Sequence, residues 1–118
     1  MRCRLIGIPA HYFELFSRPL EGIVLLEGPA QDTDLIHFFV TTPEELHATL
    51  PGLRRELRQK GCIWISWPKK SSGVRSDISE DVIRQAAFEA GLVDIKVCAV
   101  DKTWSALKLV IPVRHRKP

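Results

Sequence analysis

Apolar and polar positions divide the chain into segments of different character. Residues 3–8 predict a first strand that ends before Pro9, and the runs at 23–26 and 35–40 are continuously apolar. The run Cys62–Trp67 is rich in β-branched and aromatic side chains and predicts a further strand. Continuous apolar runs, rather than strict alternation, are typical of strands covered on both faces. They therefore indicate a parallel sheet with helices on its faces.

A helix is predicted after the third strand. Thr42 stands at the N-cap position, and leucines then recur at helical spacing as far as Leu57. Pro51 and Gly52 interrupt this stripe, so we expect a kink or two short helices. We expect Gly61 to end the element, with basic side chains in its last turn.

The C-terminal third predicts a second helix followed by a hairpin. Ser79 is the expected N-cap of the helix and Gly91 its end. Two alternating runs follow and are joined by polar residues 101–103, which predicts an antiparallel hairpin at one edge of the sheet. A short helix is also predicted near the N-terminus, at 11–16. On the first strand of the hairpin, four apolar side chains are expected to share a face: Val93, Ile95, Val97 and Ala99.

Length and composition favour one folded domain. The chain has 118 residues, enough for one domain and too few for two. Its hydrophobic fraction of 45% is typical of globular domains, so we do not expect disorder. We predict a single α/β domain over residues 1–113, with a three-layer Rossmann-like arrangement, a mostly parallel sheet and a C-terminal antiparallel hairpin. Residues 114–118 are expected to form a basic tail.

Charge and cysteine content exclude several classes of function. The net charge of +3 is mildly basic, and the run Arg114–Lys117 is interpreted as solvated, so we do not expect a nucleic acid partner. No apolar run approaches the roughly 20 residues that cross a bilayer, and the N-terminus is unlike a signal peptide. Cys3, Cys62 and Cys98 are too scattered for a disulfide framework or a metal site. We therefore expect buried, reduced thiols, a cytoplasmic location, and no metal or membrane partner.

The order of elements resembles a class I S-adenosylmethionine-dependent methyltransferase with pieces removed. The likeness is clearest from Lys60-Gly61 through the strand, the helix ending at Gly91-Leu92, and the hairpin. The stretches 64–73 and 91–110 resemble the signatures of a small bacterial family of unknown function. This resemblance covers residues 60–110 best. It implies a reduced methyltransferase-like topology and brings no activity with it.

The chain departs from the methyltransferase pattern at the cofactor site. In those enzymes a glycine-rich turn follows the first strand, and an acid ends the second. Here the turn holds one glycine, Gly7, and a proline, Pro9, which has no N–H to offer. Glu27 ends the second strand in the ribose position, but too few residues precede Leu35 for the usual helix and third strand. We expect no cofactor, with S-adenosylmethionine as the alternative.

The longest polar loop contains the strongest candidate for a binding site. It leaves a central strand at the edge where ligands bind in open α/β sheets, and it leads to a helix N-terminus. Two ammonium groups and nearby backbone N–H groups suit a phosphate or carboxylate. The alternative is a solvated connection whose lysines supply solubility. The candidate anion site consists of Lys69, Lys70, Ser71, Ser72 and Gly73.

Four further residues are candidates for lining a pocket beside this loop: His11, Glu27, Trp67 and Trp104. Core packing is the alternative for the two tryptophans. His11 follows the first strand at the same sheet edge and is a candidate donor or proton acceptor. His37, inside an apolar strand, is interpreted as a hydrogen-bonded core histidine. The chain has no Gly-x-Ser-x-Gly elbow, so it lacks the usual nucleophile of a Ser/His/Asp hydrolase.

These observations lead to three functional hypotheses. The first is a non-catalytic domain that binds a small anionic ligand or a protein partner at loop 69–73. The second is an enzyme that uses S-adenosylmethionine or a related nucleotide through Glu27 and the turn after the first strand. The third is a homodimer that pairs through an exposed edge strand.

Overall fold

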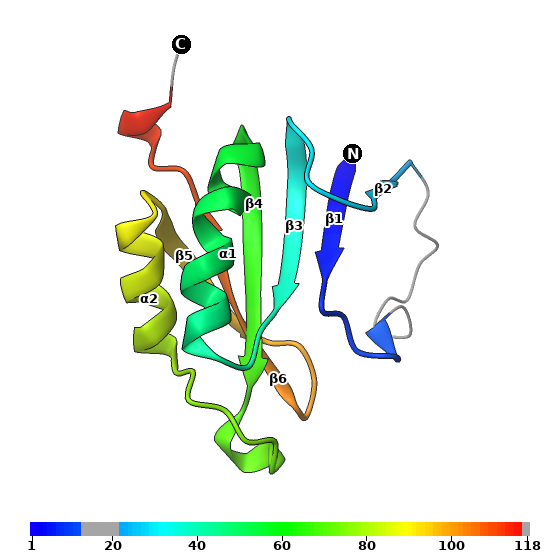
Figure 1. The fold of residues 1–118 in the computed structure, drawn as a ribbon, viewed down its shortest axis with the longest axis vertical. Coiled ribbons are helices and arrows are strands. Elements are labelled where there is room, and N and C mark those ends of the chain that lie inside the picture. The colour runs from blue at the N-terminus through cyan, green and yellow to red at the C-terminus, as the bar shows by residue number, and fades with distance from the viewer. Residues whose placement is uncertain (13–21, 117–118) are drawn as a thin grey trace.

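The computed structural model describes residues 1–12 and 22–116. Within them, six strands form one sheet in the order β2-β1-β3-β4-β6-β5 (Figure 1). The strands are β1 (Arg2–Ile6), β2 (Val24–Leu26), β3 (Thr33–Phe39), β4 (Leu57–Pro68), β5 (Val93–Ala99) and β6 (Trp104–Val110). The helices are α1 (Pro43–Glu56) and α2 (Glu80–Glu89), with single 3₁₀ turns at Lys70–Ser72 and Val113–His115.

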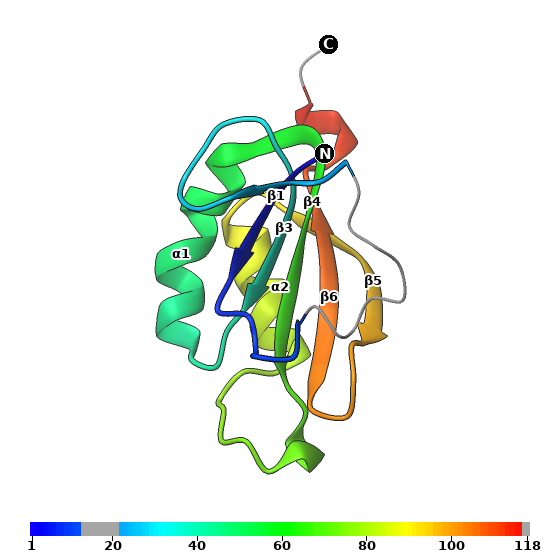
Figure 2. The same cartoon turned by 90° about the vertical axis from the view of Figure 1, so that its right-hand side faces the viewer.

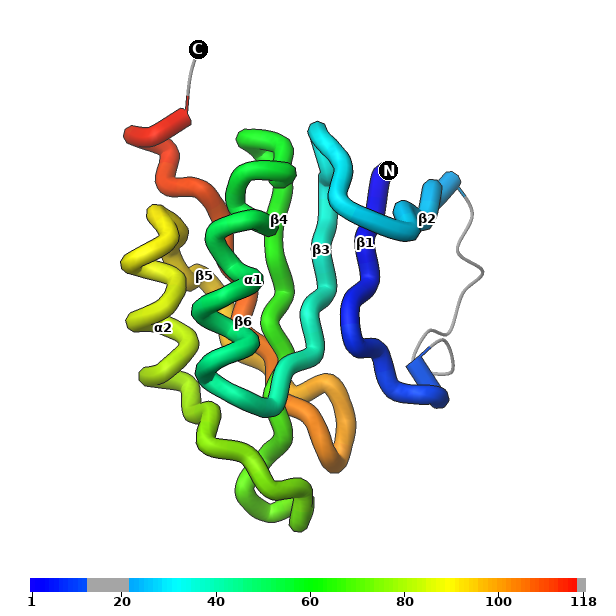
Figure 3. Tube along the Cα trace, viewed as in Figure 1, coloured from blue at the N-terminus to red at the C-terminus, as the bar shows by residue number. Residues whose placement is uncertain are grey.

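The first four strands run parallel. Strand β1 pairs with β2 and β3, and β3 pairs with β4, in the parallel sense that the apolar runs predicted. Strand β6 is antiparallel to both β4 and β5. The carboxyl ends of β1, β3 and β4 therefore meet at one edge of the sheet, together with the turn between β5 and β6 (Figure 3).

The core lies on one face of the sheet. Alternate strand residues such as Ile36, Ile65 and Leu107 are fully buried beneath α1 and α2. Both helices lie side by side on this covered face (Figures 1 and 2). The described residues thus form two layers, and the three-layer arrangement remains a prediction. Most of the helix predicted at 11–16 lies outside the described residues.

Helix α1 begins at Pro43, directly after Thr42, the N-cap that the sequence predicts. The Thr42 hydroxyl accepts a hydrogen bond from the Glu45 N–H at 3.3 Å, and Pro43 occupies the first helical position. Of the two predicted alternatives, two short helices are absent, because α1 continues through Pro51 as one helix. Its buried residues are Leu46, Leu50, Leu53 and Glu56.

The predicted end of this helix at Gly61 is wrong. Helix α1 ends at Glu56, and Leu57 already belongs to β4, where it pairs with Thr33. Gly61 lies within the strand: a Cβ there would come 2.7 Å from the Asp34 carbonyl oxygen. The glycine is therefore needed for close approach of two strands, not for a helix cap.

Helix α2 follows its predicted signals at both ends. The Ser79 hydroxyl accepts from the Val82 N–H, and the flanking Ile78 and Ile83 are both buried, as a hydrophobic staple requires. Gly91 has φ +79°, and the Leu92 N–H donates to the Ala87 carbonyl at 2.8 Å. That 6→1 bond is the Schellman ending.

Strand β5 does not place its four apolar residues on one face. The register with β6 shifts between Asp94 and Lys96, so Ile95 lies in a bulge and the alternation reverses there. Asp94 consequently shares a face with Leu109 and accepts a hydrogen bond from Arg84 of α2 at 3.0 Å. Val93 and Val97 end up on opposite faces.

Strand β2 is an exposed edge strand. The prediction that residues 23–26 are covered on both faces is wrong, because Val24 and Leu25 are about half exposed, at 53% and 49%. With its partner β1 on one side only, β2 has no neighbour at its outer edge among the described strands. No helix in the described residues has the length and hydropathy of a membrane span.

Candidate functional site

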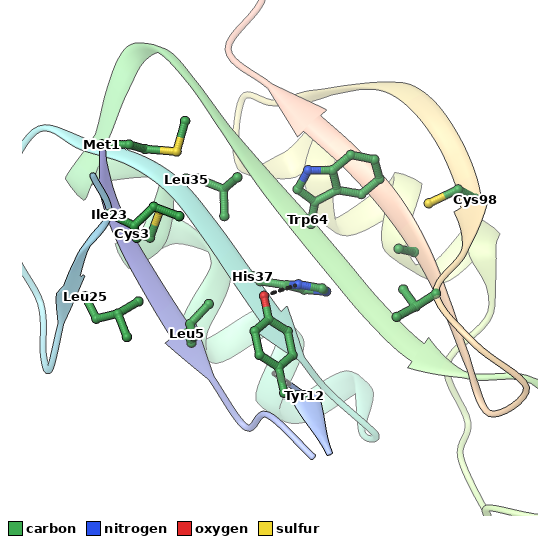
Figure 4. A pocket seen from close by; sticks show the side chains of 12 residues that line it. Met1, Cys3, Leu5, Tyr12, Ile23, Leu25, Leu35, His37, Trp64 and Cys98 are labelled. Carbon is green, nitrogen blue, oxygen red and sulfur yellow. Dashed lines mark hydrogen bonds between the residues drawn. The ribbon is translucent and has the colours of Figure 1, made fainter. Parts of the chain in front are cut away.

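The second face of the sheet carries a pocket of about 330 Å³. Its floor comes from the strand residues that alternate with the core, so we call this side the open face (Figure 4). Twelve side chains line it, and none of them belongs to Asp, Glu, Lys or Arg. The titratable side chains in the lining are those of Tyr12, His37 and two cysteines. They are Met1, Cys3, Leu5, Tyr12, Ile23, Leu25, Leu35, His37, Trp64, Cys98, Val100 and Ala106.

A chain of three hydrogen-bonded side chains lies at one end of this pocket. The Tyr12 hydroxyl is 3.1 Å from His37 Nδ1, as Figure 4 shows, and His37 Nε2 is 2.7 Å from Ser66 Oγ. Ser66 is fully buried and does not line the pocket. The predicted hydrogen bonding of His37 is confirmed, but the side chain lines the pocket on the open face and does not belong to the core.

Burial keeps the imidazole of His37 and the phenol of Tyr12 neutral at physiological pH. It lowers the pKa of His37 to about 4, because the charged imidazolium would lose its hydration. It raises the pKa of Tyr12 to about 12 for the corresponding reason. The pocket therefore offers a neutral imidazole and a neutral phenol, and none of its lining side chains carries a charge. The charged group among the lining residues is the backbone ammonium of Met1, which donates a hydrogen bond to the Gly22 carbonyl.

Aromatic side chains continue the open face toward the carboxyl edge. The His37 ring stacks on Phe39 with centroids 4.3 Å apart, and Trp104 meets Phe39 edge-on at 5.0 Å. Tyr12 packs edge-on against both His37 and Phe39. This cluster fixes the position of the Tyr12 hydroxyl.

The three cysteines are reduced, and all lie on the open face. Cys3 is buried, whereas Cys62 and Cys98 are half-buried, so the expectation of buried thiols holds fully for Cys3 alone. Burial raises the pKa of the Cys3 and Cys62 thiols. A raised pKa leaves little thiolate at neutral pH, so these two side chains act as small apolar groups.

His11 has a carboxylate partner that the sequence did not reveal. Its Nε2 atom is 2.8 Å from Asp101 Oδ2, in the turn between β5 and β6. Burial raises the pKa of Asp101, but hydrogen bonds from His11 and from the N–H groups of Trp104 and Thr103 outweigh it, and the pKa lies below its usual range. The pair joins the segment after β1 to this turn, 90 residues away.

The structure places loop 69–73 at the carboxyl edge of the parallel strands. Lys70–Ser72 form one 3₁₀ turn, and the Ser72 hydroxyl donates to the Lys69 carbonyl at 2.6 Å. Lys70, Ser71 and Gly73 are exposed, and Gly73 has φ +81° with open space around it. The Lys69 N–H donates to the Thr103 carbonyl, which joins this loop to the same turn that binds His11.

The four predicted lining residues do not line the 330 Å³ pocket. Trp67 is 7% exposed and packs in the core on the covered face. Glu27 is exposed beyond the end of β2. His11 and Trp104 lie near the pocket, next to its lining residue Tyr12 and within the aromatic cluster, but outside the lining itself.

The residues at the carboxyl edge do not fit S-adenosylmethionine as a methyltransferase holds it. Gly7 has φ +66°, and a Cβ there would lie 2.6 Å from the Phe39 carbonyl oxygen. The space on the side where a Cβ would stand is thus filled by β3. Pro9 lacks an N–H, and its carbonyl is already bonded to the Tyr12 N–H.

Sequence reasoning missed the pocket for a physical reason. Its lining comes from apolar strand positions, which have the same signature as a face covered by helices. Tyr12 lies outside every predicted strand, and its contact with His37 joins segments 25 residues apart. One signal was present: the continuous run at 35–40 contains a histidine, which a face packed only against apolar side chains would not favour.

Comparison with solved structures shows a methyltransferase-like fold. An S-adenosylmethionine-dependent methyltransferase from Aquifex aeolicus superposes with a TM-score of 0.68 at 16% identity, covering 95% of this chain and 82% of that one. A TehB-like methyltransferase from Corynebacterium glutamicum gives 0.56 at 15%, covering 76% and 56%. LepI in complex with S-adenosylhomocysteine and a substrate analogue gives 0.59 at 14%, covering 94% of this chain and 36% of that chain. These identities show the fold alone.

The chain is shorter than several of these neighbours, spanning about a third of LepI. A search of curated proteins finds no match. The family model described as "Protein of unknown function (DUF3052)" matches residues 25–113. This match extends from β2 to the 3₁₀ turn after β6. The chain belongs to the DUF3052 family.

Proposed function

We propose that this chain is a non-catalytic binding domain that holds a small, neutral and mostly apolar ligand in the pocket on the open face. The observation that carries this proposal is a volume of about 330 Å³ lined without a single charged side chain at pH 7. Ligand pockets are typically apolar hollows of about 300–1,000 Å³ with a few fixed polar groups. Here the Tyr12–His37 pair supplies the polar group.

The chemistry of the pocket supports binding rather than catalysis. The Ser66 hydroxyl next to His37 is fully buried, so a ligand in the pocket does not contact it. The thiols of Cys3 and Cys62 have raised pKa values and are weak nucleophiles. Both ring nitrogens of His37 are already hydrogen-bonded, so this neutral group gives the pocket one fixed polar position while the apolar side chains supply most of the contact with a ligand.

A neutral fluorescent probe tests this proposal. We expect N-phenyl-1-naphthylamine to bind the wild-type protein saturably, with a rise in probe fluorescence, because its rings bury apolar surface in the pocket. The variant Leu35→Trp places a large side chain in the lining and should abolish the rise. The matched control Val113→Trp adds the same side chain at a position that is 75% exposed, and it should bind as the wild type does.

Thermal melts of all three proteins establish that each is folded. Equal binding by Leu35→Trp and the wild type would show that the probe does not bind in the open-face pocket. Absence of saturable binding by the folded wild type would contradict the proposal that the protein binds a neutral, apolar ligand.

Loop 69–73 is a second candidate, for a small anionic ligand or a protein partner. Its position at the carboxyl edge supports this, as does the exposed turn with Gly73 in open space. The acidic residues Glu80 and Asp81 in the first turn of α2 weaken that helix end as an anion site. Isothermal titration with phosphorylated metabolites should show binding that the double variant Lys69→Ala/Lys70→Ala loses. Equal binding by the variant would eliminate the loop.

The enzyme alternative predicts affinity for S-adenosylmethionine despite the poor fit of Gly7 and Pro9. A saturable rise in melting temperature with that cofactor would favour it, since a ligand that binds only the folded state stabilises it. Glu27→Gln should then reduce the rise. We expect no shift.

Homodimerisation through β5 is supported by one observation. This edge strand exposes Val93, Ile95 and Val97, and Ile95 is 56% exposed. Unpaired edges with apolar side chains favour strand addition. Light scattering tests this: a dimer that Ile95→Lys converts to a monomer would support pairing through β5, and a monomer at millimolar concentration would exclude it.

A further inference from the structure

A second pocket, of about 300 Å³, lies at the opposite edge of the sheet, where the parallel strands begin. Its lining is polar and mostly basic, unlike that of the open-face pocket, and the two share no residue. The side chains that matter for its chemistry are Asp32, Arg54, Arg55, Arg58, Gln59 and His115.

The fold brings these residues together from three parts of the chain. Arg54 and Arg55 are in the last turn of α1, and Arg58 follows in the first residues of β4. Pairing of Cys62 with Val110 places the end of β6 beside this segment, so the 3₁₀ turn containing His115 completes the pocket. Figure 1 shows the end of α1 and this C-terminal turn at the same end of the molecule.

Among the described residues, two of the three guanidinium groups in this pocket have no carboxylate partner. Arg58 is 3.1 Å from Asp34, whose pKa is lowered by the Arg2 N–H and by Arg58 itself. Within residues 1–12 and 22–116, neither Arg54 nor Arg55 lies within ion-pair distance of an acid. Arg54 and Arg55 are thus the cations of this pocket that are left to bind a ligand.

The neighbouring acids do not neutralise the pocket. Glu56 points away, into a buried site where it accepts hydrogen bonds from Arg4, Thr33 and Ala30. Asp32 is the one carboxylate in the lining, and it is exposed.

A basic last turn is common in helices because it complements the helix dipole. That explanation covers Arg54 and Arg55. It does not account for the third arginine, Arg58, which lies in a strand. Nor does it account for His115, which receives a 3.4 Å hydrogen bond from the Arg114 guanidinium. The helix dipole therefore does not explain why Arg58 and His115 line the same pocket as Arg54 and Arg55.

We propose that this pocket binds the diphosphate group of a small molecule. Two unpaired guanidinium forks match two neighbouring phosphate groups, because each fork can donate two parallel hydrogen bonds to phosphate oxygens. Arg58 and His115 add donors at the sides, and the volume of about 300 Å³ suits a diphosphate with part of the group it carries. The site lies apart from loop 69–73, which is at the carboxyl edge.

Titration calorimetry with inorganic pyrophosphate at low salt tests the proposal. We expect saturable binding by the wild type that weakens as salt is added, since the contacts are between charges. The double variant Arg54→Gln/Arg55→Gln should bind at least tenfold more weakly. The matched control Lys96→Gln/Lys102→Gln removes the same charge from exposed positions of the β5–β6 hairpin and should bind as the wild type does. Circular dichroism establishes that both variants are folded.

Each of the following outcomes would contradict the proposal that this pocket binds a diphosphate group. Loss of binding in the lysine variant alone would place the anion at the β5–β6 hairpin. Equal weakening in both variants would show a diffuse effect of net charge. No binding by the folded wild type would leave the pocket without a diphosphate ligand. A single-stranded DNA 12-mer that binds more tightly than pyrophosphate, in a way that depends on Arg54 and Arg55, would replace the small molecule by nucleic acid.

Discussion

The two faces of the sheet are built from alternate residues of the same strands, yet they have different neighbours. On the covered face, Ile36 and Ile65 pack under two helices and are fully buried. On the open face, Leu35 and Trp64 line a pocket instead. The side chains of the two faces are similarly apolar, so hydrophobicity does not distinguish a core from a binding surface in this chain.

Polar groups differ more clearly between the two faces. Among the described residues, the covered face buries one carboxylate, Glu56, which is held by Arg4, Thr33 and Ala30 at the end of α1. The open face instead carries the neutral chain Tyr12–His37–Ser66 beside an unfilled volume. Polar groups thus join α1 to the sheet on one side, and on the other they join Tyr12, β3 and β4 beside the pocket. The following predictions test this difference between the two faces.

The largest difference is expected from deleting side chains on the two faces. Ile65→Ala removes a fully buried core side chain and should lower the free energy of unfolding by about 4 kcal/mol. Leu35→Ala enlarges a pocket that already exists and should cost about 1 kcal/mol. Urea denaturation measures both values. Equal losses would show that the open face is packed as tightly as the core.

A pH dependence is expected from His37. Its pKa is about 4 when folded and near 6.5 when unfolded, so between these values the unfolded state binds a proton that the folded state does not. The free energy of unfolding therefore falls as the pH falls from 6.5 to 4, by about 3 kcal/mol for this group.

The comparison that isolates His37 uses urea midpoints at pH 7, 5.5 and 4.5. The variant His37→Asn should lose stability less steeply than the wild type over this range. His47→Asn, a change at an exposed histidine, should keep the wild-type slope. Parallel slopes for the wild type and His37→Asn would mean that His37 is not held neutral.

A smaller effect is expected from substituting Gly7, which lies close to the backbone of β3 at Phe39. Gly7→Ala puts a Cβ 2.6 Å from the Phe39 carbonyl oxygen at a positive φ and should cost about 2 kcal/mol. Gly73→Ala has a positive φ but open space, so strain alone should cost about 1 kcal/mol. Thermal melts compare the two. If Gly7→Ala is the milder change, the turn after β1 has room for a ligand after all.

The smallest effect is expected from Tyr12→Phe. It removes the hydroxyl that contacts His37 Nδ1 and should lower stability by about 1 kcal/mol, the usual net value of a hydrogen bond. Affinity for N-phenyl-1-naphthylamine should change little, because that probe has only one polar group and binds mainly through its rings. A large loss of probe binding would show that Tyr12 shapes the pocket rather than orienting polar ligands.

Local signals predicted the ends of elements only where a side chain or glycine acts within its own turn. Thr42, Ser79 and Gly91 were all placed correctly, because each satisfies backbone groups a few residues away. The end of α1 was not, because Leu57 continues the leucine spacing although it belongs to β4. Pairing of Leu57 with Thr33, 24 positions earlier, decides that boundary.

The candidate sites show the same division. The position of loop 69–73 at the carboxyl edge follows from strand order, so sequence reasoning placed it. The pairing of His11 with Asp101 and the hydrogen-bonded chain through Tyr12 join distant segments and escaped it. The basic pocket was missed because Arg58 was interpreted as a charge in the last turn of a helix, and Arg54 and Arg55 were assigned no role.

The sequence by itself determined the order of the main strands and helices, the caps at Thr42, Ser79 and Gly91, and the largely parallel sheet, since these depend on interactions between near neighbours and on apolar content. The tertiary structure alone decided which face the helices cover and which is left as a pocket. Alternate residues in these strands are equally apolar. The choice between the two faces therefore rests on where the connections after β3 and β4 lead the chain, which no local pattern records.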